Sequence, residues 1–243
     1  MVDHDSGRQV WAGKGANQDT LRSFFDALGP ERCARLSHIS CDGAEWMHDV
    51  MAEKAPQALV CLDPYHVVSW ATKALDKLRR RLAGELRHRG RPEQAASLKD
   101  SRWALLKNPA ELTGAQKSTL AGIRADNEPL YRGYLLKEQV RYVFRADGVS
   151  EAKSLLGGWL AWAGRSRIPE FTRLSETIRR FQTLIWHTLE SGLSNARLEA
   201  SNNHLRLIQR RGYGYRSAES LIAISDLVLG RLGPPLPRTR LTL

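Results

Sequence analysis

The sequence has little cysteine and no long apolar run. Its three cysteines, Cys33, Cys41 and Cys61, are an odd number without C-x-x-C spacing, so neither a disulfide framework nor a zinc knuckle is indicated. No apolar stretch approaches the roughly 20 residues that cross a bilayer, and the opening residues lack the apolar segment of a signal peptide. We therefore expect a cytoplasmic protein without a membrane partner.

Acidic residues are scarce over most of the chain. Among 243 residues, 37 are Lys or Arg and 26 are Asp or Glu, which gives a net charge of +11. Residues 1–66 hold 6 basic and 10 acidic side chains, net −4, whereas residues 67–243 hold 31 and 16, net +15. This excess favours a polyanionic partner, nucleic acid before membrane. Hydrophobic residues make up 42%, a globular composition that argues against general disorder.

The first 66 residues alternate between the patterns of strands and helices. They predict, in chain order, a hairpin over 1–13, an amphipathic helix over 17–28 ended by Gly29-Pro30, a strand over 36–40, a helix over 44–55 and a strand over 58–62. This alternation favours an α/β fold with a mixed sheet, in which the last two strands are parallel.

From residue 67 to about 190 the apolar spacing is that of helices. It predicts helices over 67–91, 93–107, 115–145, 149–163 and 170–189. Five of the seven tryptophans lie in this block, and we interpret them as the core of a helical bundle rather than as base-stacking side chains: Trp70, Trp103, Trp159, Trp162 and Trp186. The segment 231–243 is rich in proline without apolar periodicity, which predicts a mobile tail.

An aspartate follows each of the two predicted strands. Asp42 follows the first and Asp63 follows the second. Ligands of α/β proteins gather at the carboxyl ends of parallel strands, and two carboxylates there can share a divalent cation such as Mg²⁺. The alternative is that each aspartate caps a helix or forms a turn. His66 could orient a carboxylate or a phosphate, or it could simply open the next helix.

A second candidate stretch covers residues 194–216, SNARLEASNNHLRLIQRRGYGYR. It predicts a helix that begins near Ser194 or Asn195 and places Glu199, Asn202 and Arg206 on one face. The alternative is an ordinary solvated helix with a glycine at its end. The end of the stretch interleaves glycine with arginines and tyrosines suited to phosphate contacts, namely Arg210, Arg211, Tyr213, Tyr215 and Arg216.

These motifs carry a resemblance to a known family. The run Ser194–Asn202, with its Arg-Arg-Gly-Tyr-Gly-Tyr continuation, resembles the last catalytic motif of DDE-type transposases from bacterial insertion sequences, in the ISL-type group. In that family a Ser-Asn-Gly opening precedes the catalytic glutamate, and Ala196 replaces the glycine here. Asp42 and the run from Pro56 to His66, with its aspartate-x-x-histidine element, resemble the middle motifs. The similarity extends from about residue 1 to 230.

The resemblance implies an RNase H-like mixed sheet interrupted by a long helical insertion. It implies that three carboxylates bind two Mg²⁺ or Mn²⁺ ions for DNA strand cleavage and strand transfer. Asp42 would be the second acidic ligand and Glu199 the third, with Asp63, His66 and Asn202 in support, and Asp63 remains the alternative second ligand. The implied partners are the DNA of the element ends and the target, bound by a homo-oligomer. The DNA contacts that we expect come from Arg206, Arg210, Arg211, Tyr213, Tyr215, Arg216, Arg79, Arg80 and Arg81.

The resemblance also implies a domain order. It comprises the first part of the catalytic core over 1–66, the helical insertion over 67–190, the last catalytic helix and basic segment over 191–230, and the tail over 231–243. The family's first catalytic aspartate lies on a strand that precedes those of this chain, which predicts a truncated core with little or no recombinase activity. The alternative is a basic DNA-binding protein without catalysis. A membrane-surface helix over 67–91 is less favoured, because its Trp and Leu residues suit a core.

Overall fold

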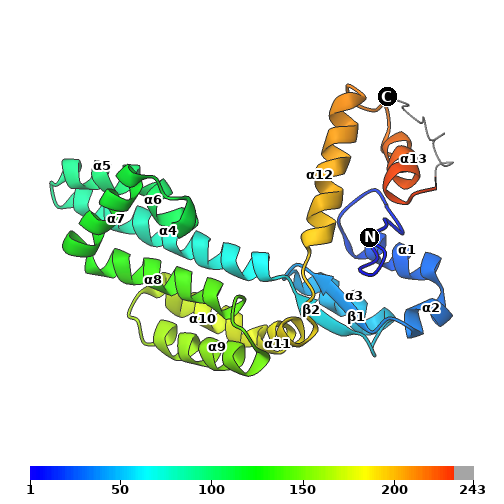
Figure 1. The fold of residues 1–243 in the computed structure, drawn as a ribbon, viewed down its shortest axis with the longest axis horizontal. Coiled ribbons are helices and arrows are strands. Elements are labelled where there is room, and N and C mark those ends of the chain that lie inside the picture. The colour runs from blue at the N-terminus through cyan, green and yellow to red at the C-terminus, as the bar shows by residue number, and fades with distance from the viewer. Residues whose placement is uncertain (233–243) are drawn as a thin grey trace, which may run out of the picture. The chain divides into compact units, whose positions relative to one another are not determined.

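The computed structural model describes residues 1–232, which divide into two units (Figure 1). The split unit comprises residues 1–60 together with the chain from residue 194 onward, and the helical unit comprises residues 61–193. Most of the predicted tail over 231–243 lies outside the described residues. None of the helices in the described part of the chain is both long and apolar enough to span a bilayer.

The front of the split unit follows the predicted alternation. Its elements are α1 (Gln18–Leu28), α2 (Pro30–Ala34), β1 (His38–Cys41), α3 (Glu45–Lys54) and β2 (Leu59–Leu62), whose last two residues belong to the helical unit. Between residues 1 and 232, β1 and β2 form a two-stranded parallel sheet, smaller than the mixed sheet that we expected. The described chain is mostly helical and keeps a mixed α/β character.

Helix α1 begins and ends where its sequence predicts. The side chain of Asn17 accepts a hydrogen bond from the Thr20 amide, which caps the helix start. Gly29 ends the helix with φ of 81°, a conformation that disfavours side chains with a Cβ. Leu21 and Phe25 are buried on the inner face, at 5% and 2% exposure, in a small core shared with α3.

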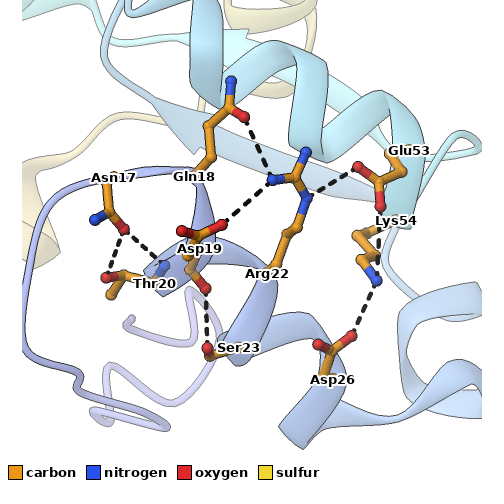
Figure 2. A network of polar contacts seen from close by, with 9 residues as sticks. All are labelled: Asn17, Gln18, Asp19, Thr20, Arg22, Ser23, Asp26, Glu53 and Lys54. Carbon is orange, nitrogen blue, oxygen red and sulfur yellow. Dashed lines mark hydrogen bonds and ion pairs between the residues drawn. The ribbon is translucent and has the colours of Figure 1, made fainter.

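Ion pairs also join α1 to α3 at the surface, as Figure 2 shows. Arg22 Nε donates to Glu53 Oε2 at 3.1 Å, and Lys54 Nζ donates to Asp26 Oδ1 at 3.0 Å. Exposed pairs of this kind contribute about 0–1 kcal/mol each. The apolar core beneath them therefore holds the two helices together, and the ion pairs add to their alignment.

The predicted hairpin over 1–13 is a tight turn with one antiparallel bridge, between Val2 and Gln9. The Asp3 carboxylate accepts hydrogen bonds from the amide and the hydroxyl of Ser6, which fixes the turn. The Gln9 side chain donates to Ser225 Oγ and to Asp226 Oδ1, both at 2.7 Å. This opening segment is therefore anchored to the last helix of the split unit.

Two helices complete the split unit. Helix α12 (Ala196–Arg211) matches the predicted one, whereas α13 (Ala218–Leu229) was not predicted; the two pack against each other. Ser217 caps α13 by accepting a hydrogen bond from the Ser220 amide. Helix α12 has no fully buried residue. The three apolar residues expected to face inward from it are half-buried, namely Leu198, Leu205 and Ile208.

The helical unit confirms the predicted helices, but three of them are each divided in two. Ser101 breaks the first by donating its hydroxyl to the Leu98 carbonyl. The predicted helix over 115–145 is divided near Pro129, because proline fits the first turn of a helix but not its interior. One helix ends at Asp126 and the next begins at Glu128. The elements are α4 (Pro64–His88), α5 (Pro92–Asp100), α6 (Arg102–Leu106), the 3-10 turn η1 (Pro109–Glu111), α7 (Gly114–Asp126), α8 (Glu128–Val143), α9 (Val149–Gly164), α10 (Pro169–Arg180) and α11 (Gln182–Ser191).

The tryptophans of this unit support its core, with one exception. Trp159 is fully buried and donates from Nε1 to the Leu136 carbonyl at 2.8 Å. Three others, Trp70, Trp162 and Trp186, are partly buried against the same core. Trp103 is 56% exposed, so the core interpretation is wrong for this residue. Instead, the guanidinium of Arg102 lies over the face of the Trp103 ring, 5.0 Å from the ring centroid.

Candidate functional site

Asp42 directly follows β1 and is exposed. The residue at the N-cap of α3 is Ala44, so Asp42 does not cap that helix. Asn195 Nδ2 donates to Asp42 Oδ1 at 3.4 Å, while Ser40 Oγ donates to Asn195 Oδ1 at 2.8 Å. A buried amide, 6% exposed, therefore contacts both the strand and the carboxylate that follows it.

Glu199 belongs to the same arrangement through the backbone. Asn195 is the N-cap residue of α12, and its carbonyl accepts a hydrogen bond from the Glu199 amide at 2.8 Å. The Glu199 side chain is exposed in the first turn of the helix. Asn202 is exposed one turn further along, followed by Arg206, whose Nη1 donates to Asn203 Oδ1. Asn195 thus links the strand end with Asp42 to the helix with Glu199.

Asn195, Ser40 and His48 lie around Asp42 in the structure, and the sequence patterns did not mark them as site residues. His48 lies on α3 and hydrogen bonds to the backbone of Asp42, and burial lowers the pKa of its imidazole. A neutral imidazole beside Asp42 adds no positive charge that would compete with a cation. The only sequence signal was the position of Asn195 in the Ser-Asn opening of the motif.

Asp42 and Glu199 have the chemistry that Mg²⁺ requires, because carboxylate oxygens are hard ligands and both side chains are exposed. Within residues 1–232, however, no three His, Cys, Asp or Glu side chains gather as a metal site. The described residues therefore provide at most a part of the expected set of three carboxylates.

Asp63 and His66 belong to the helical unit. Asp63 is 3% exposed at the N-cap of α4, where its side chain makes no capping hydrogen bond. The His66 ring meets the Trp70 ring edge-on, with 5.2 Å between centroids, and Trp70 in turn lies 5.6 Å from Phe181. His66 thus takes part in an aromatic cluster at the start of α4.

The basic end of α12 is open to solvent. Arg210, Arg211 and Arg216 are exposed, and Tyr213 is 100% exposed with φ of 50°. Tyr215 instead packs over Gly212, where an added Cβ would lie 2.9 Å from the ring. Tyr215 therefore packs within the loop. Tyr213 projects from it in a backbone conformation that is uncommon for a side chain of its size.

The three predicted arginines of α4 differ in their surroundings. Arg79 is 5% exposed, binds Asp76 through Nη2 at 2.7 Å and donates from Nη1 to the carbonyls of Leu98 and Lys99. Arg81 pairs with Glu170, whose hydrogen bond raises the pKa of the guanidinium. Arg79 is therefore buried within the unit, whereas Arg81 is held in ion pairs with Glu170 and Glu85 and stays partly exposed. Arg80 also pairs with Asp76, from Nε to Oδ2 at 3.1 Å, but its side chain is the most exposed of the three, at 63%.

Comparison with known proteins identifies the class. A family model described as a transposase, of the DDE type and the ISL3 group, matches residues 1–225. The chain therefore belongs to the ISL3-type family of DDE transposases.

Named relatives support the same family. The chain is 45% identical, over 98% of its length, to the "Transposase for insertion sequence element IS1557" of two Mycobacterium tuberculosis strains, and it covers 57% of those proteins. It is 29% identical over 88% of its length to the "Transposase for insertion sequence element IS1001" of Bordetella parapertussis, and covers 52% of it. The chain thus spans about half the length of these relatives. No solved structure matches it.

Proposed function

We propose that this chain forms part of the catalytic core of a DNA transposase, which cleaves strands at the ends of an insertion sequence and joins them to a target. The observation that carries the proposal is the link through Asn195, which connects the strand end bearing Asp42 to the helix bearing Glu199. Family membership and the named relatives support the class of reaction. We propose an RNase H-like arrangement for the complete core, with residues 67–190 as its helical insertion.

Two carboxylates of this chain would bind the metal, Asp42 and Glu199. Divalent ions bound by such a site can activate a water or a DNA 3′-hydroxyl and stabilise the leaving oxygen. Asn195 positions both ligands, and Asn202 supports them on the same helix. We prefer Asp42 to Asp63 as the second ligand, because Asp42 is exposed whereas Asp63 is 3% exposed. His66 would support Asp63 if that alternative holds.

The DNA backbone would be bound by the basic end of α12. The exposed guanidinium groups of Arg206, Arg210, Arg211 and Arg216 offer charged donors to phosphates without a carboxylate partner among residues 1–232. Tyr213 offers a free aromatic face for stacking on a base, while Tyr215 supports the loop. We propose that Arg80 adds a further phosphate contact and that the DNA-bound form is a homo-oligomer.

Metal-dependent DNA binding tests this function. Fluorescence anisotropy with a labelled duplex is measured in EDTA and in Mg²⁺ at constant ionic strength. We expect Mg²⁺ to strengthen binding by the wild-type chain several-fold, because the ion bridges carboxylates and phosphate. The double variant Asp42→Asn/Glu199→Gln should bind in EDTA at least as well as wild type, yet gain nothing from Mg²⁺.

The control is Asp19→Asn/Asp49→Asn, which removes the same charge from two exposed aspartates on α1 and α3. It should keep the full Mg²⁺ response. An equal response from all three proteins would contradict the assignment and favour the second candidate, a basic DNA-binding protein without catalysis. That candidate has its own support in the exposed arginines Arg210, Arg211 and Arg216 and in the net charge of +11.

A further inference from the structure

A cavity of about 550 Å³ lies within the split unit, between α12, α13 and the turn at residues 6 and 7. This volume is in the usual range for a small-molecule site. Neither Asp42 nor Glu199 lines it. The cavity is therefore a feature additional to the proposed metal ligands, although it shares helix α12 with them.

The charge of the cavity is of one sign. Arg197, Arg211 and Arg231 line it, and none of the described residues around it is acidic. Arg197 Nη1 donates to the Asp5 carbonyl at 3.1 Å beside Gly7, which leaves its other donors for a ligand. Arg211 and Arg231 form no ion pair within residues 1–232. Three guanidinium groups around one cavity repel each other unless an anion lies between them.

The rest of the wall is apolar with a few hydroxyl and imidazole groups. Leu207 and Val228 are 45% and 56% exposed where they line the cavity, so the fold leaves this apolar surface uncovered. Ser201 and His204 lie on the same helix and can exchange hydrogen bonds with a polar edge. A ligand that satisfies these groups has an anionic part and a flat, largely apolar part.

We propose that the cavity binds one nucleotide unit, with its phosphate toward the guanidinium groups and its base against Leu207 and Val228. This proposal rests on the proposed function, which makes an unpaired nucleotide of a DNA strand the expected ligand. A free mononucleotide offers the same chemistry. Inorganic phosphate would satisfy the arginines and leave the apolar wall exposed. A nucleoside without phosphate would cover the apolar wall and leave the arginines without an anion.

Isothermal titration calorimetry with dAMP, deoxyadenosine and inorganic phosphate tests the cavity. We expect dAMP to bind more tightly than either part alone. Arg211→Gln should weaken dAMP binding by about tenfold, the usual effect of one charged hydrogen bond. Arg35→Gln is the control, because Arg35 is an exposed arginine of the same unit that does not line the cavity and has no part in the proposed DNA contacts; its dAMP affinity should stay within twofold of wild type.

A second variant tests the apolar part. Ala200→Leu fills the lining without changing charge, at an exposed helical position that tolerates leucine. It should weaken dAMP binding and leave phosphate binding unchanged. Equal losses for Arg35→Gln and Arg211→Gln, or no preference of dAMP over phosphate, would overturn the proposal.

Two DNA probes identify the source. A duplex with one unpaired adenine should bind more tightly than the fully paired duplex, and Arg211→Gln but not Arg35→Gln should remove the difference. If the duplexes bind equally while dAMP still binds, the cavity takes a free nucleotide. The Mg²⁺ response that depends on Asp42 and Glu199 is a separate readout, so failure of the metal assignment and failure of the nucleotide cavity can be told apart.

Discussion

Asn195 makes three contacts that few other residues could make together. Its side-chain oxygen accepts from Ser40, its side-chain nitrogen donates to Asp42, and its carbonyl accepts from the Glu199 amide. The side chain must therefore accept through one atom and donate through another, which the carbonyl oxygen and the amino group of an amide provide. At the residue scale, the proposed site depends on this amide as much as on the two carboxylates.

Asn195→Ala should lower the free energy of unfolding by about 1–2 kcal/mol, because Ser40 and Asp42 lose a partner in a largely buried position. Asn203→Ala is the matched control on the same helix, since Asn203 is exposed and its side chain accepts a hydrogen bond from Arg206; its effect should stay within about 0.5 kcal/mol. Urea denaturation followed by circular dichroism measures both. Equal effects would show that the Asn195 bonds contribute nothing specific to stability.

The arginines of α4 show what the sequence does not reveal at this scale. Arg79, Arg80 and Arg81 are adjacent and chemically identical, so a basic run predicts the same role for each. In the structure Arg79 binds the carbonyls of Leu98 and Lys99, and only Arg80 stays largely exposed. Which arginine is used internally depends on the helix packed opposite, and residue spacing alone does not encode that.

At the scale of elements, the helical unit depends on a close approach between α8 and its neighbours. Gly133 is buried on α8, and a Cβ there would lie 2.5 Å from Leu78 and 3.3 Å from Phe171. Leu78 belongs to α4 and Phe171 to α10, and both are fully buried. The glycine therefore allows three helices to meet at one point, at the expense of helix propensity.

Gly133→Ala should destabilise the chain by about 1–2 kcal/mol, because the overpacking outweighs the gain in helix propensity. Gly122→Ala is the control within α7, where an added Cβ meets nothing within 4 Å; it should stabilise the chain by about 0.5–1 kcal/mol. Thermal unfolding of both variants measures the difference. A stabilising Gly133→Ala would contradict the packing of α4, α8 and α10 described above.

Much of the element order could be predicted from the sequence, and the failures have physical causes. Apolar periodicity located α1 and α4, since each buries one face. It did not reveal the break at Ser101, because a serine hydroxyl that bonds back to the backbone leaves the apolar spacing intact. Helix α13 was missed although Ser217 caps it, since its apolar residues are not on one clear stripe.

At the scale of the whole molecule, the chain combines an acidic opening with a basic remainder. The net charge of +15 over residues 67–243 is consistent with the DNA partner that we propose. The candidate site itself was only partly predictable. The sequence identified Asp42 by its position after a strand and Glu199 by its place within a motif. The hydrogen bond between Asn195 and Asp42 joins residues 153 positions apart, and only the folded structure reveals it.

The family match and the structure together define the central claim, which is that Asp42 and Glu199 contribute to one metal site. Cleavage of the polypeptide by bound Fe²⁺ with ascorbate and peroxide tests it most directly, because the radicals cut the backbone close to the ion. We predict fragments that end near residue 42 and near residues 195–199, lost in Asp42→Asn and retained in Asp49→Asn. Cleavage elsewhere, or at one of the two segments only, would contradict the shared site.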